Sequence, residues 1–269
     1  MKDYKNYLNT LEDFKNGKIP DDKIKCFPFF NQCNFKINSL VIIAGRPGIG
    51  KTTFALNILK KIIENNRKTD VVYFSLEMNK TEIFDKLTAM TVDFVNFKWL
   101  NNKEQIETWK TLIDIKMAFF YDRLRIYDNF FEINEIINAI IKLKKQHPDL
   151  KVVFIDYLGL SISYESDRYL KFGKFTREMH QLAKKLNICI VALNQLNRFA
   201  DNSEVPELIH LRDSGTIEQD AEQVFLLYEK DQKFYVKIAK NRYGISGITQ
   251  QFDFLKEKAI IKETDVDSS

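Results

Sequence analysis

The residues of this sequence that are best suited to chemistry begin at position 45, directly after a short apolar run. Residues 45–52, GRPGIGKT, have the spacing G-x-x-x-x-G-K-[ST], in which backbone amides close around nucleotide phosphates. The lysine would supply charge to the β- and γ-phosphates, and the threonine hydroxyl suits Mg²⁺. An apolar run before the motif and a helical pattern after it disfavour a chance match. The residues expected to bind nucleotide are Gly45, Arg46, Pro47, Gly48, Gly50, Lys51, Thr52 and Thr53.

Two carboxylates stand at the ends of two other apolar runs. Asp156 ends the run VVFID, where it fits the carboxylate associated with Mg²⁺ beside a phosphate loop. Glu77 follows the run VVYFS, where it would orient or deprotonate an attacking water molecule. Acidic residues are also favoured in the first turn of a helix, so Glu77 fits the start of the next helical pattern equally well. We therefore expect Thr52 and Asp156 to hold the metal, with two interpretations of Glu77 open.

An amide and two cations follow later strands. Gln195 comes after the run ICIVAL and is placed to sense the loss of a γ-phosphate, although a surface-loop position also explains it. Lys240 and Arg242 lie two residues apart on an expected strand, so their side chains point the same way. They would reach a triphosphate in the same or a neighbouring subunit, or they form a solvated basic pair.

A long polar stretch spans residues 197–220, between two expected strands. Loops of this length in a compact domain are usually functional. Arg198 and Arg212 are candidates for contacts with phosphate, and Gly215 would permit a close backbone approach. A solvated loop without such a role is the alternative.

The rest of the pattern indicates the elements that position these residues, because apolar runs typical of buried parallel strands alternate with helical patterns. The expected strands are 40–44, 71–75, 124–128, 152–156, 188–193, 223–229, 234–239 and 248–254, and the expected helices are 51–66, 79–92, 103–118, 132–146 and 168–186. This order predicts an α/β fold with a mainly parallel sheet, helices on its faces and an antiparallel edge. Ligands of such sheets bind at the carboxyl ends of the strands.

The N-terminal segment has a separate pattern. Apolar residues recur at helical spacing over residues 3–16, and Asn16-Gly17 and Pro20 end this short amphipathic helix. The phenylalanine-rich residues 27–30 are interpreted as an apolar anchor for the connector rather than a base-stacking platform. The expected organisation is an N-terminal helix and connector over 1–36, one main domain over 37–262, and a flexible acidic tail over 263–269.

Composition excludes several classes of protein. The 269 residues are 45% hydrophobic, which excludes wholesale disorder. A net charge of +4 is too mild to diagnose nucleic-acid binding. No apolar run suits a membrane span or a signal segment, and three cysteines without a C-x-x-C pair argue against a disulfide framework or a zinc site. We expect a cytoplasmic protein with no membrane partner.

Six motifs in order carry a resemblance to a known family. They are AGRPGIGKTTFALNI, YFSLEM, FIDYLGL, ALNQLNR, LRDSGTIEQDA and AKNRYGISG. Over roughly residues 37–254, the chain resembles the RecA-type motor domain of the DnaB-class replicative DNA helicases. The resemblance implies a RecA-like fold, ATP and Mg²⁺ as cofactors, single-stranded DNA as a partner, and a homo-oligomer that we expect to be a hexamer.

The resemblance also implies roles for the candidate residues. Glu77 would be the catalytic carboxylate and Gln195 the γ-phosphate sensor, while Arg242, with Lys240 beside it, would be an arginine finger inserted into the neighbouring subunit's site. With Lys51, these are the implied catalytic residues. The stretch LRDSG would line a central channel, and the N-terminal helix would dock on the adjacent subunit. The implied DNA-binding residues are Arg198, Arg212, Asp213 and Gly215.

Two departures from the family pattern bear on function. The family normally carries a helical domain before the linker, which meets primase, so we expect either a minimal mobile-element or phage-type helicase or a fragment. Asp213 replaces the usual Glu and Asn194 the usual Ser, and neither change removes a catalytic group.

The implied function is an ATP-driven ring helicase that translocates on single-stranded DNA and unwinds duplex during replication, with primase, a loader or a host replicative helicase as further partners. The alternatives are an ATP-gated adaptor or regulator of a full-length helicase, and a RecA-fold recombinase or clock-type ATPase.

Overall fold

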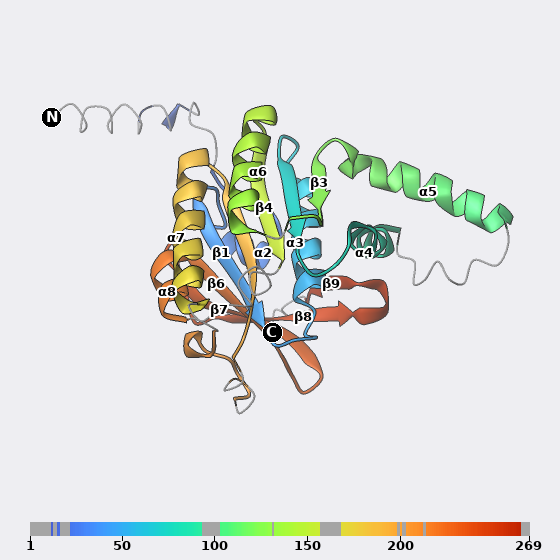
Figure 1. The fold of residues 1–269 in the computed structure, drawn as a ribbon. Coiled ribbons are helices and arrows are strands. Elements are labelled where there is room, and N and C mark those ends of the chain that lie inside the picture. Colours follow the sequence, from blue (N-terminus) through green and yellow to red (C-terminus); the bar gives the residue numbers. More distant parts are fainter. Residues whose placement is uncertain are drawn as a thin grey trace.

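A computed structural model shows one sheet with helices on both faces (Figure 1). It describes residues 12, 15, 16, 22–92, 103–130, 132–156, 168–197, 200, 203–211 and 214–264. The amphipathic helix expected over residues 3–16 lies almost wholly outside these residues, as do residues 265–269 of the expected tail. The expectation of a flexible tail from residue 263 is wrong for Glu263, which ends the strand Ile260–Glu263 and accepts a hydrogen bond from the amide of Phe29 at 2.7 Å. In the described part of the chain, no helix has both the length and the apolar character needed to cross a membrane.

Within the described ranges, the strands and helices expected from the apolar pattern are present, with ends shifted by a few residues. The strands are β1 (Ser39–Gly45), β2 (Asp70–Ser75), β3 (Leu124–Tyr127), β4 (Leu150–Asp156), β5 (Cys189–Gln195), β6 (Gln223–Lys230), β7 (Lys233–Asn241), β8 (Thr249–Leu255) and β9 (Ile260–Glu263). The helices are α2 (Pro28–Gln32), α3 (Lys51–Asn65), α4 (Lys80–Val92), α5 (Lys103–Tyr121), α6 (Ile133–Gln146), α7 (Arg168–Leu186) and α8 (Ser214–Asp220), with 3₁₀ turns η3 (Leu208–His210) and η4 (Lys256–Lys258).

The sheet has the predicted mixed topology. Its order is β3-β2-β4-β5-β1-β6-β7-β8-β9; the first six strands pair in parallel, and the pairs from β6 to β9 are antiparallel. Strand β1 is buried along its whole length because helices cover both faces, which explains its continuous apolar sequence. A two-residue turn joins β6 to β7, and both of its residues, Asp231 and Gln232, have positive φ as such hairpins require.

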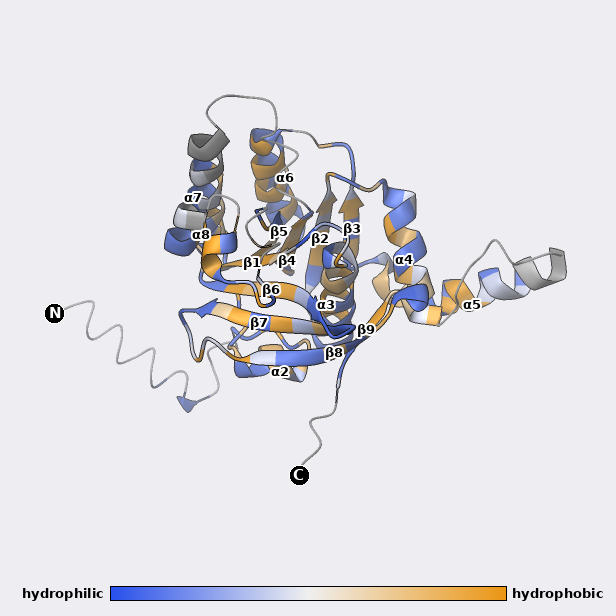
Figure 2. Ribbon diagram, turned by 90° about the horizontal axis from the view of Figure 1, so that it is seen from below, coloured by the Kyte–Doolittle hydropathy of each residue, from blue (hydrophilic) through white to orange (hydrophobic). Residues whose placement is uncertain are grey.

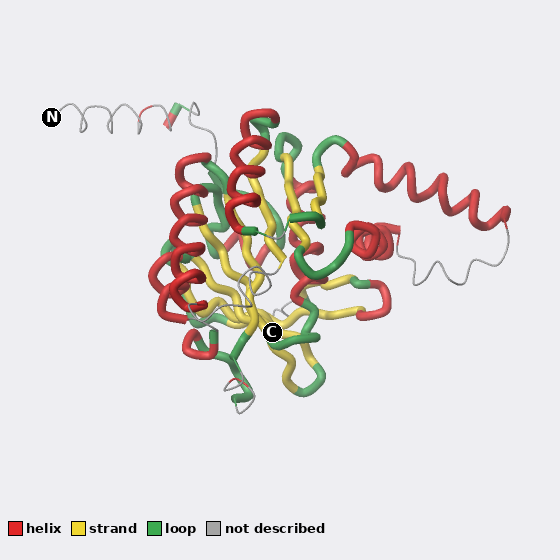
Figure 3. Tube along the Cα trace, viewed as in Figure 1, coloured by secondary structure: helices red, strands yellow, loops and turns green. Residues whose placement is uncertain are grey.

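Helices flank both faces of the sheet, and their apolar segments are visible in the hydropathy colouring (Figures 2 and 3). Two hydrophobic cores lie on opposite faces of the sheet. One core gathers side chains from α2, α3 and α4, and the other gathers side chains from α6, α7 and α8. Strand β1 contributes alternate residues to both, so Val41 and Ile43 face one core and Ile42 faces the other. This arrangement fixes β1 and its carboxyl end at the centre of the molecule.

Residues 24–35 are part of the first core. Phe30 is fully buried, and its ring lies 5.8 Å from that of Phe35, 5.9 Å from that of Phe54 and 4.5 Å from that of Phe225. The interpretation of residues 27–30 as an apolar anchor is thus confirmed. The connector is therefore buried in the same core as the sheet, and this core includes residues upstream of residue 37.

The polar stretch over residues 197–220 contains more regular structure than a loop. The expectation of a loop is wrong for its end, where α8 forms and packs on α7. Ile217 and Ala221 lie one helical turn apart and are both fully buried, so two apolar residues suffice to seat the helix. A polar composition concealed this short stripe.

Candidate nucleotide-binding site

The phosphate loop leaves the carboxyl end of β1, between β5 and β6. Gly48 and Gly50 have φ of +77° and +101°, a region that favours glycine. A Cβ atom on Gly50 would also lie 2.7 Å from the ring of Phe254. A Cβ atom on Gly45 would lie 2.8 Å from Ile49 and 3.1 Å from the carbonyl oxygen of Leu227. The glycines of the motif are therefore required by backbone conformation and by space.

Helix α3 begins directly after the loop and presents its N-terminus to it. Gly50 is the N-cap, and no side chain caps the helix, which suits a bound phosphate. The ammonium group of Lys51 donates to the carbonyl oxygens of Gly45 at 3.2 Å and Arg46 at 3.0 Å. Burial lowers the pKa of Lys51, while the negative charges of Asp156 and Glu77 oppose that shift. Lys51 is thus held over the loop where a phosphate would be bound.

Thr52 and Asp156 meet as expected for residues that hold a metal. The Thr52 hydroxyl donates to Asp156 Oδ2 at 2.6 Å. Burial raises the pKa of Asp156, which is 1% exposed, and its hydrogen bonds oppose the shift. Mg²⁺ prefers oxygen ligands of this kind. No group of three or more His, Cys, Asp or Glu residues is arranged to hold a metal in the described ranges, so a cation here would also need oxygens from nucleotide and water.

Tyr73 is a residue of this site that the sequence reasoning missed. Its hydroxyl donates to the same oxygen of Asp156 at 2.7 Å, from the middle of β2. Burial raises the pKa of Tyr73 well above its usual range, and the negative charge of Asp156 acts in the same direction. A tyrosine in an otherwise apolar strand needs a partner for its hydroxyl, which is the signal that could have identified it.

Glu77 lies in the bend between β2 and α4, with its side chain exposed. Helix α4 begins at Lys80, and Asn79 and Glu82 cap it by two reciprocal hydrogen bonds of 2.9 and 3.0 Å. The interpretation of Glu77 as part of the first helical turn is therefore wrong. The Ser75 hydroxyl donates to the carbonyl of Met78 at 2.6 Å, which holds the bend beside the end of β4.

Gln195 ends β5 next to the phosphate loop. Its Cα pairs with that of Gly45, and its backbone amide donates to the side chain of Asn194 at 2.9 Å. The alternative of a surface-loop position for Gln195 is therefore wrong.

Arg46 of the phosphate loop donates from its guanidinium group to the carbonyl oxygens of Ala200 and Ser203, the latter at 3.4 Å.

A cavity of about 430 Å³ lies against the outer strands of the sheet. Its wall includes Phe234, Phe254 and Lys256. Since a Cβ atom on Gly50 would meet the ring of Phe254, this cavity adjoins the phosphate loop.

Lys240 and Arg242 lie at the other end of the sheet. At the loop end, Gly45 of β1 pairs with Leu227, whereas at the amino end Val41 pairs with Gln223, which in turn pairs with Asn241. Val41 and Gly45 are four residues apart on β1, which corresponds to a distance of about 13 Å along the strand. The fold thus keeps these two cations away from the phosphate loop of their own chain.

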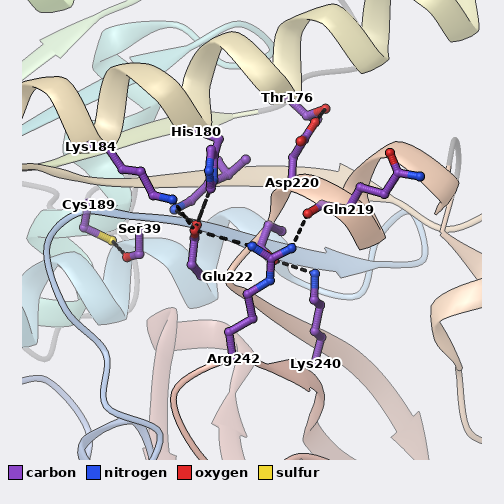
Figure 4. A network of polar contacts seen from close by, with 12 residues as sticks. Ser39, Thr176, His180, Lys184, Cys189, Gln219, Asp220, Glu222, Lys240 and Arg242 are labelled. Atoms are coloured by element: carbon purple, nitrogen blue, oxygen red, sulfur yellow. Dashed lines mark hydrogen bonds and ion pairs between the residues drawn. The ribbon is translucent and has the colours of Figure 1, made fainter.

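The two cations are bound to backbone rather than freely solvated (Figure 4). Lys240 donates to the carbonyl oxygens of Glu218 and Ala221, the latter at 2.7 Å, and Arg242 donates to that of Gln219.

Of the expected DNA-binding residues, Gly215 is exposed on α8, whereas Arg198, Arg212 and Asp213 lie outside the described residues.

Comparisons with solved structures agree with this fold. One solved ATPase domain superimposes with a TM-score of 0.81 at 25% identity, over 97% of this chain and 98% of that one. A DnaB-like replicative helicase, described with its interactions with primase, gives 0.80 at 25% identity, over 96% of this chain and 66% of that one. A KaiC-like protein from Pyrococcus horikoshii gives 0.64 at 17% identity, over 91% and 99%, which shows a common fold alone.

Comparisons with curated sequences point to the same class. The replicative DNA helicase DnaB of Helicobacter pylori is 34% identical over 243 residues, which are 85% of this chain and 46% of that protein. The Rickettsia conorii protein of the same name is 33% identical over 74% of this chain and 43% of its own length. This chain thus spans about half the length of these relatives. The model of the DnaB-like helicase C terminal domain matches residues 32–263. The phosphate loop, the carboxylates, the fold and the sequence comparisons all indicate one family. The chain belongs to the family of DnaB-like helicase C-terminal domains.

Proposed function

We propose that this chain is the ATP-hydrolysing motor of a DNA helicase that assembles as a hexameric ring and translocates on single-stranded DNA. The observation that carries the proposal is the division of the expected catalytic groups between the two ends of the sheet. Lys51, Thr52 and Asp156 gather at the carboxyl end, while Lys240 and Arg242 lie at the amino end. A site with all of these groups needs two chains side by side.

Each group has a chemical task in ATP hydrolysis. The loop amides and Lys51 would bind the β- and γ-phosphates, and the base would occupy the cavity beside Phe254. Thr52 and Asp156 would hold Mg²⁺, which neutralises charge on the phosphates.

Glu77 is the proposed base. It would accept a proton from water as the water oxygen bonds to the γ-phosphorus and the bond to the β-phosphate oxygen breaks. Gln195, at the same edge, would then lose its contact with the departing phosphate. Arg242 from the neighbouring chain would stabilise the transition-state charge.

The proposal is tested by particle mass and turnover together. Mass photometry, with and without a non-hydrolysable ATP analogue and oligo-dT, is expected to show a ligand-promoted species of six chains. Arg242→Ala is expected to lower ATP turnover by about 10³-fold or more while leaving ATP binding intact, as for other arginine fingers. A monomer under every condition, or normal turnover in the variant, would overturn the ring motor. Activity that appears only with a full-length replicative helicase would indicate an adaptor.

A further inference from the structure

A buried carboxylate lies where α8 meets β6, and neither the family motifs nor the proposed mechanism assigns it a role. Glu222 is 2% exposed, and its Oε2 accepts a hydrogen bond from the amide of Leu40 at 2.9 Å. Its backbone amide donates to the carbonyl of Leu40, also at 2.9 Å. Glu222 is therefore fixed to the amino end of β1 by two bonds to one residue.

Three basic side chains surround this carboxylate (Figure 4). The ring of His180 lies 3.1 Å from Oε1, the ammonium of Lys184 lies 3.7 Å from it, and the guanidinium of Arg242 lies 3.9 Å from it. His180 and Lys184 come from α7, while Arg242 follows β7. A buried carboxylate needs hydrogen-bonding and basic partners, and those of Glu222 come from both elements, so Glu222 links them to each other.

The backbone continues the same arrangement. The amide of Arg242 donates to the carbonyl of Glu222 at 2.9 Å, and its guanidinium reaches the carbonyl of Gln219. Lys240 bonds to the carbonyls of Glu218 and Ala221. Both cations are thus held against the end of α8, where carbonyl groups without helical partners attract positive charge. Arg242 is still 43% exposed, so its outer face is open to a neighbour.

We propose that Glu222 is a positioning residue for Arg242 and Lys240, and that it sets the angle at which they meet the nucleotide of the neighbouring subunit. The proposal rests on the proposed function, because the cations need a site in trans on which to act. Glu222 itself touches no substrate, and its effect on turnover passes through Arg242.

The first test is the turnover of Glu222→Gln, with Glu178→Gln, at a half-exposed position of α7, as the matched control. We expect kcat to fall about 10²-fold in Glu222→Gln, as for a displaced catalytic group, with the KM for ATP within about twofold of wild type. The control is expected to keep both values. A wild-type kcat in Glu222→Gln would overturn the proposal.

Mixed rings separate positioning from structural damage. Lys51→Ala subunits cannot use their own site but keep Glu222 and Arg242, so they are expected to restore turnover at the sites of Glu222→Gln subunits. Failure of this rescue, with rings still formed, would overturn the proposal. If Arg242→Ala subunits are not rescued either, or turn over normally alone, the proposed trans function has failed instead.

A second variant covers the case in which Glu222→Gln does not fold. His180→Phe keeps an aromatic ring, slightly larger than imidazole, and removes the polar contact with Glu222. It is expected to lower kcat several-fold, and to lower it no further when Arg242 is already Ala, because residues that act as one unit are not additive. An equal fall in both backgrounds would assign His180 and Glu222 a purely structural role and overturn the proposal.

Discussion

Replacing Tyr73 with phenylalanine tests whether the second hydroxyl on Asp156 matters. Tyr73→Phe removes one oxygen from a fully buried ring and leaves the hydrocarbon packing unchanged. Asp156 Oδ2 would keep the hydrogen bond from Thr52 and lose the one from Tyr73, now 2.7 Å long. The change therefore isolates a single contact in the site.

The structure sets the size and the pH dependence of the effect. A hydrogen bond to a charged group contributes about 1.5–3 kcal/mol, and one to a neutral group about 0.5–1.5 kcal/mol. Burial raises the pKa of Asp156, so its contribution to the free energy of unfolding is present at low pH and is lost as pH rises through that pKa. The hydrogen bond from the tyrosine hydroxyl to the charged carboxylate offsets part of this loss. The deficit of Tyr73→Phe is therefore expected to be about 1.5–3 kcal/mol where Asp156 is charged, and smaller at acid pH where it is protonated.

The assay is urea unfolding in EDTA, at neutral pH and at successively lower pH. Tyr235→Phe is the matched control, because Tyr235 lies half-exposed on β7 and its hydroxyl has no hydrogen-bond partner among the described residues. A loss below about 0.5 kcal/mol at neutral pH, or one equal to that of the control, would refute the reasoning. A loss that grew at acid pH would refute the assigned protonation.

Four other changes have expected outcomes. Phe30→Ala is expected to lower the free energy of unfolding by about 3–5 kcal/mol in chemical denaturation, whereas Phe119→Ala, at a ring 47% exposed, should cost far less; equal losses would contradict the core role of the connector. Asn57→Ala should cost about 2 kcal/mol and speed hydrogen exchange in β9, because its side chain accepts from Ile261 at 3.1 Å and donates to Ala259 at 2.9 Å; unchanged exchange would contradict this. Glu77→Gln should keep ATP binding and lower turnover at least about 10²-fold, and normal turnover would remove the proposed base. Affinity for oligo-dT should fall with salt, with a log–log slope of about −0.7 per neutralised phosphate, and a flat response would remove tracking along the backbone.

The local parts of the site were predictable from neighbouring residues in the chain. The phosphate loop, its glycines and the lysine are contiguous, and the requirement for glycine at Gly48 and Gly50 follows from the turn itself. The strands β1, β2, β4 and β5 were recognisable because burial on both faces demands continuous apolar runs. Asp156 and Glu77 followed from their positions at the ends of such strands.

Other parts were not predictable because their evidence is divided along the chain. Glu77 fitted a helix or a strand exit equally well until the Asn79 cap showed where α4 begins. Helix α8 was concealed by its polar sequence, since two buried apolar residues suffice to seat it. The short strand β9 pairs with β8 and also bonds to Asn57, which is far away in the sequence.

By itself, the sequence predicted a phosphate loop between a buried strand and a helix, and its six ordered motifs indicated one family. Those features depend on residues within a few positions of each other. Only the tertiary structure decided that Lys240 and Arg242 are separated from their own loop by about 13 Å of strand. It also decided that Tyr73 contacts Asp156 at one end of the sheet and that Glu222 contacts Arg242 at the other. Strand order and register bring these residues together, and both depend on pairing between segments that are distant in the sequence, so no local stretch of the chain predicts them.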